Sequence, residues 1–193
     1  MKSKALITLI ITLISIQCYS QKSNEFRIYY GFVDSKLLRN SDLEGGGNYD
    51  NENSYEFGLK YLRKISGKLF FESGINYLSS QVRITTALTG LPFSSRTEDL
   101  KMISVPIYAN YSFGKYFFVN GGAILDFQNS QKSFDSQSGI GYSIGVGGKY
   151  DFDEFSIFVN PNYKRHSLIP FEKENNHQKL TEFGIQVGLG YGF

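Results

Sequence analysis

Cysteine is nearly absent from this chain of 193 residues, because Cys18 is the only one. Cys18 lies in an expected leader, so the remaining chain has no disulfide bond and no thiolate metal site. An excess of charge of one sign is also lacking, since the formal net charge is +2. The chain therefore presents no basic field, and we expect no nucleic-acid partner. No cofactor motif stands out, so no cofactor is expected.

Long apolar runs are lacking after the first twenty residues. Lys2 and Lys4 precede an apolar or hydroxyl-bearing run over residues 5–16. That run is too short for a membrane-spanning helix, which needs about 20 residues. A basic start followed by such a run is typical of a secretory signal peptide. We therefore predict a signal peptide over residues 1–20 and one mature domain over residues 21–193.

The end of the leader has the pattern of a signal-peptidase site. Cys18 and Ser20 stand at the −3 and −1 positions before Gln21, where small residues are required. Acylation of Cys18, as in a lipoprotein, is the alternative. It fits less well, because Ile16 and Gln17 stand where small residues are wanted.

Glycine and aromatic residues are plentiful, with 20 Gly, 14 Tyr and 17 Phe. After residue 20 the sequence has no helical periodicity, and apolar residues alternate with small or polar ones, as in β-strands. The alternation is clearest near the end of the sequence, where Phe, Ile, Val, Leu and Tyr alternate mostly with Gly. Eight strands are predicted near residues 25–34, 54–63, 68–79, 101–113, 115–127, 139–150, 154–164 and 181–193.

The expected connections alternate in length along the chain. Tight turns are expected near residues 64–67, 114 and 151–153, and longer connections over residues 35–53, 80–100, 128–138 and 165–180. Strands of about ten residues are long enough to cross a bilayer when tilted, and lipid cannot bond an open sheet edge. The predicted fold is all-β, an eight-stranded antiparallel up-and-down transmembrane β-barrel with periplasmic turns and extracellular loops.

The two faces of the predicted strands differ in chemistry. One face has aliphatic residues at mid-strand and Tyr or Phe near the strand ends, like the aromatic girdles of a membrane barrel. A soluble barrel or sandwich would instead turn the Gly-, Ser- and Asn-rich face to water. A mean hydropathy of −0.25 does not oppose the membrane alternative, since only alternate residues face lipid. Charged residues on the inner face must pair: Arg27, Glu56, Lys60, Glu72, Asp126, Lys149 and Lys164.

Three features resemble the outer-membrane β-barrel domain family of small PorT-like and OmpA/OmpX-like barrels. They are the leader ending before Gln21, the hairpin formed by residues 103–111 and 117–122 around a Gly-Lys turn, and the terminal strand ending in Phe193. Asn110 replaces the basic residue usual in that hairpin. The resemblance implies an outer-membrane location among lipid and lipopolysaccharide. It also implies that the barrel-insertion machinery reads Phe193.

One pair of residues suggests catalysis. His166 and Ser167 follow an expected strand, with Glu172 and Glu174 close in sequence, and outer-membrane lipid A deacylases use a His, a Ser and an acid. Adjacent residues of a strand point to opposite faces, so this pair is not expected to hydrogen-bond. A polar margin of a loop is the preferred interpretation, and we expect no enzyme.

The first long connection contains Asp42, Glu44 and Asp50 beside a glycine triplet. Oxygen ligands of this kind bind Ca²⁺ in other proteins. The spacing matches no EF-hand, so a solvated loop is expected rather than a metal site.

The function that fits best is a non-enzymatic structural or binding barrel. Its wall would hold four extracellular loops against a protein or glycan partner, and eight strands leave an interior that side chains fill, unlike a porin. Two alternatives stay open. One is a membrane-embedded lipid A-modifying hydrolase, and the other is a narrow channel or accessory subunit of a secretion or transport assembly.

Overall fold

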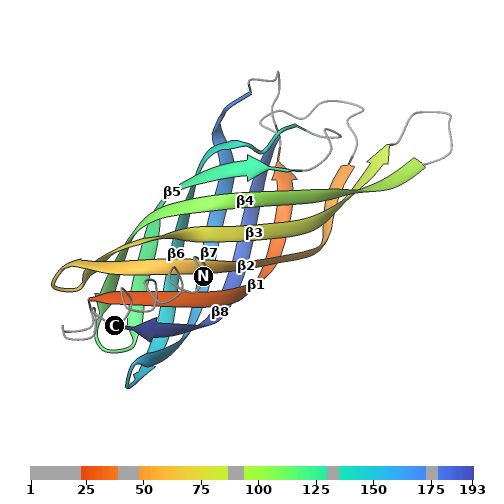
Figure 1. Ribbon diagram of the computed structural model, residues 1–193. Coiled ribbons are helices and arrows are strands. Elements are labelled where there is room, and N and C mark those ends of the chain that lie inside the picture. Colours follow the sequence, from red (N-terminus) through yellow and green to blue (C-terminus); the bar gives the residue numbers. More distant parts are fainter. Residues whose placement is uncertain (1–22, 39–47, 87–93, 130–134, 173–177) are drawn as a thin grey trace, which may run out of the picture.

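The chain closes into a single antiparallel barrel (Figure 1). The computed structural model describes residues 23–38, 48–86, 94–129, 135–172 and 178–193. None of these residues belongs to a helix long and apolar enough to cross a membrane. Neighbours in sequence are neighbours in the barrel, and β1 pairs with β8, as predicted. The strands are β1 (Asn24–Leu38), β2 (Asn48–Ser66), β3 (Leu69–Thr86), β4 (Ser94–Phe113), β5 (Phe117–Gln128), β6 (Gly139–Phe152), β7 (Phe155–Pro170) and β8 (Lys179–Gly192).

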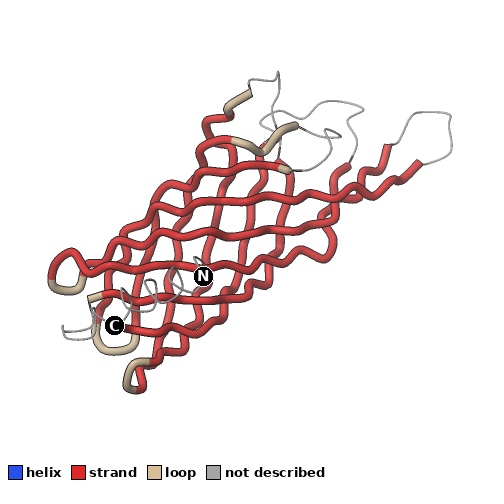
Figure 2. Tube along the Cα trace, viewed as in Figure 1, coloured by secondary structure: helices blue, strands red, loops and turns tan. Residues whose placement is uncertain are grey.

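The two ends of the barrel differ (Figure 2). At one end lie three tight turns, which contain Gly67, Gly114 and Asp153 at φ values of 50°, 66° and 53°. The first and last described strands meet here too, since the Asn24 and Phe193 backbones exchange hydrogen bonds of 3.1 and 2.9 Å. We call this the turn end, and the opposite end the loop end.

At the loop end, β1, β2, β3, β4 and β7 all run further than predicted, and β2, β3 and β4 are the longest strands. β2, β3 and β4 have 19, 18 and 20 residues, against 12 in β5. Much of the connections expected over residues 35–53 and 80–100 is therefore strand. Polar residues such as Gln81 and Thr97 interrupt the apolar alternation there, while backbone pairing continues to Thr86 and Ser94. Residues 48–53, 81–86 and 94–101 form what we call the projecting sheet (Figure 1).

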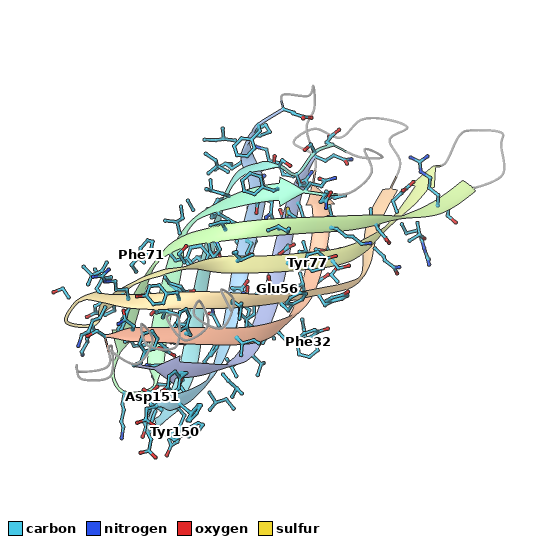
Figure 3. The ribbon with its side chains drawn as sticks, viewed as in Figure 1. Phe32, Glu56, Phe71, Tyr77, Tyr150 and Asp151 are labelled. Carbon is cyan, nitrogen blue, oxygen red and sulfur yellow. The ribbon has the colours of Figure 1, made fainter. Side chains whose placement is uncertain are left out.

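Apolar side chains cover the outer face of the barrel, as the alternation predicts. Ile28, Leu59 and Ile144 are 59, 61 and 63% exposed, and Figure 3 shows Phe32 and Tyr150 projecting outward. Outer aromatic rings contact one another across strands, as in the pair Phe57–Tyr77 at 5.4 Å between centroids. A soluble barrel with this face inward is therefore ruled out.

Interior aromatic rings lie over glycines of the neighbouring strand. Tyr29 is the register partner of Gly58, and Phe158 is the partner of Gly188. A Cβ atom built on Gly58 would lie 2.7 Å from the Tyr29 ring, and one on Gly188 would lie 2.8 Å from the Phe158 ring. Glycine on the inner face thus provides the space that a ring occupies.

Candidate functional site

The turn end of the bore contains an ion pair between aromatic rings. Arg27 Nε donates to Glu25 Oε1 at 2.8 Å, and Ser156 Oγ donates to the same carboxylate oxygen at 2.9 Å. The Arg27 guanidinium lies 5.1 and 4.9 Å from the ring centroids of Phe118 and Phe158. The buried charge is therefore both paired and in contact with two ring faces.

A second ion pair lies deeper in the bore. Lys60 Nζ is 2.8 Å from Glu72 Oε1 and donates to Gln186 Oε1 at 2.9 Å. Asn110 and Asn120 donate to the Glu72 carboxylate at 2.6 and 3.1 Å. A buried carboxylate needs several hydrogen bonds, more than a single lysine can donate. The two buried amides supply the remaining bonds to Glu72.

Toward the loop end, a lysine and a histidine alternate with three carboxylates, and we call these five buried groups the ionic chain: Glu56, Lys164, Glu182, His166 and Asp126. Lys164 Nζ donates to Glu56 and lies 3.5 Å from Glu182 Oε2. His166 Nε2 is 3.3 Å from the same Glu182 oxygen, and His166 Nδ1 is 2.9 Å from Asp126 Oδ2. Glu56, shown in Figure 3, also accepts from Gln186 Nε2 at 2.8 Å.

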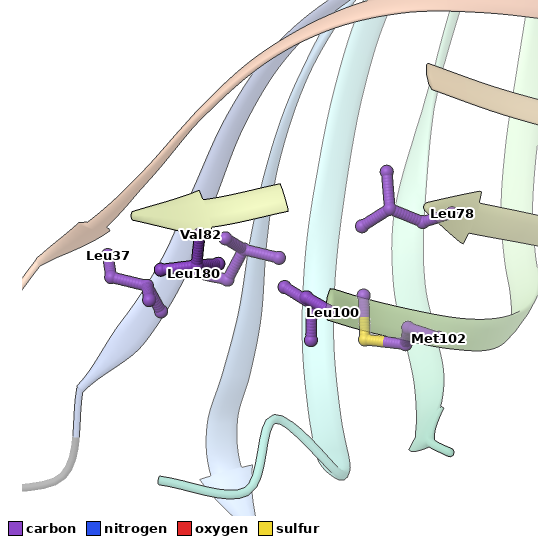
Figure 4. Packing of buried hydrophobic residues seen from close by; sticks show 6 residues of the cluster. All are labelled: Leu37, Leu78, Val82, Leu100, Met102 and Leu180. Atoms are coloured by element: carbon purple, nitrogen blue, oxygen red, sulfur yellow. The ribbon is translucent and has the colours of Figure 1, made fainter. Parts of the chain in front are cut away.

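Six apolar side chains from four strands fill the bore beyond the ionic chain (Figure 4). We call them the plug: Leu37, Leu78, Val82, Leu100, Met102 and Leu180. All are buried, and Leu180 stands one inward position beyond Glu182 on β8. A row of serine hydroxyls lies at the same end, with Ser54 Oγ 3.0 Å from Ser35 Oγ and 2.7 Å from Ser80 Oγ. From the turn end to the loop end, side chains therefore occupy the bore.

Six of the seven charged residues expected inside are buried there: Arg27, Glu56, Lys60, Glu72, Asp126 and Lys164. The seventh, Lys149, is partly exposed at the turn-end mouth and pairs with Asp151 at 3.2 Å. Asp126 pairs with a histidine rather than with a lysine. The sequence analysis did not include Glu25 and Glu182 among the inner charges. Both stand at positions of their strands that alternate with other inward-facing residues.

The expected geometry of His166 and Ser167 was wrong. A bulge separates the pairs Tyr142–Arg165 and Ile140–Ile169, and Ser167 has a φ of 49°. At this bulge, extra residues of β7 stand opposite one residue of β6. The side chains of His166 and Ser167 are therefore both buried, with 1 and 0% exposure. His166 therefore lies within strand β7, not at a loop margin.

The surroundings of His166 do not form a hydrolase triad. Both of its ring nitrogens face carboxylates, those of Asp126 and Glu182, whereas a general base needs one nitrogen toward the serine. Glu172 lies on the exposed surface after β7, and Glu174 lies outside the described residues.

Of the three suggested Ca²⁺ ligands, the structure describes only Asp50, so it shows no cluster of them. Asp50 lies in β2, where its register partners are Lys36 and Arg83, so it belongs to a strand and not to a loop. Asp42 and Glu44 fall outside the described residues. Over those residues, no group of three His, Cys, Asp or Glu side chains is arranged to hold a metal ion.

Comparisons with known proteins agree with this architecture. The profile of a family described as "Outer membrane protein beta-barrel domain" matches residues 6–193. The outer membrane protein OprG from Pseudomonas aeruginosa is similar in structure, with 18% identity, a TM-score of 0.51, and coverage of 90% of this chain and 98% of that one. The outer membrane protein AlkL, solved in lipid bilayers, has 14% identity, a TM-score of 0.53, and coverage of 91% and 92%. No curated protein sequence matches significantly.

Proposed function

The chain belongs to the outer membrane protein β-barrel domain family, and from this premise we propose that it is a non-enzymatic barrel presenting a binding surface outside the cell. In this proposal the turn end faces the periplasm and the loop end faces outward, as is usual for short turns and long loops. Export through the leader over residues 1–20 and recognition of Phe193 by the insertion machinery belong to the same proposal.

The filled bore is the observation that carries this proposal. The ionic chain and the plug occupy the space that a porin leaves for water, and an eight-stranded barrel is just wide enough for its own side chains. Such a wall is a rigid support, and binding residues are commonly held on loops and projections of rigid scaffolds.

The projecting sheet is the surface that we propose for a protein or glycan partner. The exposed side chains among its described residues are polar or charged, whereas Val82 and Leu100 face inward and belong to the plug. Its ion pairs are loose, with Arg96 3.5 Å from Glu98 and Lys101 3.4 Å from Asp99. Exposed pairs of this kind add little to stability. They are therefore free to exchange their partners for an external ligand.

Planar-bilayer recordings test the filled bore. We expect the purified barrel to give no steady conductance, because side chains of the described residues fill the interior. A general porin inserted in the same bilayers serves as the positive control. A stable current that grows with the amount of inserted barrel would contradict the proposal.

The binding role is tested with a charge-reversed surface. Labelled barrel in nanodiscs is applied to glycan arrays and to arrays of extracellular proteins. We expect a wild-type signal that falls at least tenfold in the double variant Arg96→Glu/Lys101→Glu, a loss of about 1.4 kcal/mol. The matched control is Lys68→Glu at the turn end, which should bind as the wild type does. A signal that both variants retain would exclude the projecting sheet.

Lipid A analysis tests the absence of catalysis. We expect mass spectra of lipid A to be the same in wild-type cells, in cells lacking the protein and in cells with Ser167→Ala, because His166 faces two carboxylates. Altered acylation on deletion that Ser167→Ala fails to restore would establish a hydrolase instead.

A further inference from the structure

A furrow crosses the outer face of the barrel near the turn end. Its volume is about 540 Å³, and its lining comes from β7, β8, β1, β2 and β3. Two rows of outward side chains border it, as the strand register shows. The row nearer the turn end is Phe155, Tyr191, Phe26 and Tyr61, and the other is Leu189, Ile28, Leu59 and Ile75.

The floor of the furrow is strand backbone. Arg27, Lys60 and Gly190 line it, but the side chains of Arg27 and Lys60 are buried in ion pairs inside the barrel. The furrow thus offers an apolar channel between an aromatic row and an aliphatic row. In a membrane barrel this face contacts hydrocarbon, so an acyl chain is the molecule that fits it.

Basic residues flank one side of this furrow. Arg63 follows Tyr61 by two residues on β2, so it points outward on the same face, nearer the turn end. Lys64 is the next residue of β2 and Lys68 lies in the β2–β3 turn, and all three are exposed. The Tyr61 hydroxyl, which donates to Asn24 Oδ1 at 2.7 Å, stands between the apolar furrow and these charges, as tyrosines do at a membrane interface.

We propose that the furrow and its basic flank form a binding site for one anionic phospholipid. An acyl chain lies between the two rows, and the phosphate contacts Arg63 with Lys68 beside it. Clusters of Lys and Arg at the membrane surface attract anionic head groups. The choice of a phospholipid rests on the proposed orientation, which places the turn end in the periplasmic leaflet.

Native mass spectrometry tests the site on the full chain in nanodiscs that contain phosphatidylethanolamine and phosphatidylglycerol. We expect one phosphatidylglycerol to stay bound after release. Arg63→Gln should lower its occupancy about fivefold, which corresponds to roughly 1 kcal/mol for one basic side chain. Leu59→Trp, which fills the furrow, should displace it. The matched controls are Lys115→Gln, an exposed basic residue of the β4–β5 turn, and Ile144→Trp on β6, across the barrel, and both should bind as the wild type does.

Two results would overturn the proposal. One is equal retention of both lipids, and the other is a phosphatidylglycerol occupancy that neither Arg63→Gln nor Leu59→Trp changes. Either result would mean that only non-specific surrounding lipid is bound. The orientation is measured separately, by labelling Lys68→Cys with an impermeant maleimide on intact cells. Labelling from outside would overturn the orientation, and therefore the choice of phospholipid, while the nanodisc result would still decide whether the furrow binds an anionic lipid.

Discussion

Lys164→Met is expected to lower the free energy of unfolding by about 3–5 kcal/mol, the cost of breaking a buried ion pair from one side. Lys164 lies between Glu56 and Glu182, both buried. Methionine keeps much of the volume but removes the charge, so two carboxylates would face each other without the cation between them. Urea titration of the barrel in detergent, followed by the heat-modifiable shift on gels, measures the change.

Two further variants test whether the loss of stability comes from the buried charge or from removing any lysine. Lys101→Met removes an exposed partner of Asp99 and should cost less than about 1 kcal/mol. Adding Glu56→Gln to Lys164→Met removes one of the two facing carboxylates and should recover part of the loss. If Lys164→Met costs no more than Lys101→Met, the ionic chain does not stabilise the fold.

Gly188→Ala is expected to destabilise the barrel by about 3 kcal/mol, at the upper end of the usual cost of overpacking. Gly188 lies at the closing seam, where it is the register partner of both Tyr29 and Phe158. A Cβ atom there would collide with the backbone oxygen of Ile28 as well as with the Phe158 ring. Backbone cannot move aside without disturbing the pairing of β1 with β8.

Gly148→Ala is the matched control, since it makes the same substitution in a neighbouring part of the wall. The nearest atom to a Cβ at Gly148 is the Tyr116 backbone oxygen at 3.7 Å, which is ordinary contact. Its free energy of unfolding in the same urea titration should stay within about 0.5 kcal/mol of the wild type. Equal losses in the two variants would show that the close approach at Gly188 is not what makes glycine necessary there.

Strand positions could be predicted where lipid and the packed bore impose opposite demands on alternate residues. In β8 every outward residue from Phe183 to Tyr191 is apolar, so both the strand and its phase follow from the period of two. The same argument fails in the projecting sheet, where Val82 and Leu100 face the plug but exposed positions such as Gln81 and Asp99 are polar. Backbone pairing there continues without an apolar outer face, so the predicted connections were too long.

Interior positions could be predicted better than interior partners. The phase of β2 places Glu56 and Lys60 inside, but their partners depend on how far the strands are shifted around the barrel. Glu56 meets Lys164, which is 108 residues away, and nothing local in the sequence encodes that. The bulge beside His166 adds residues that alternation cannot reveal, so the phase prediction failed there.

The inner contacts also determine the order of assembly. Ser156 of β7 reaches Glu25 across 131 residues, and Gln186 of β8 reaches Glu56 across 130, so these bonds can form only when the last two strands come together with β1 and β2. A sheet that enters the bilayer before its first and last strands meet would carry unpaired acids and amines into hydrocarbon, which is costly. It follows that hairpins should not insert one at a time. We therefore expect the nascent sheet to be sheltered from lipid until the ring closes, and closure to be slow, because it pairs strands that are far apart in the sequence.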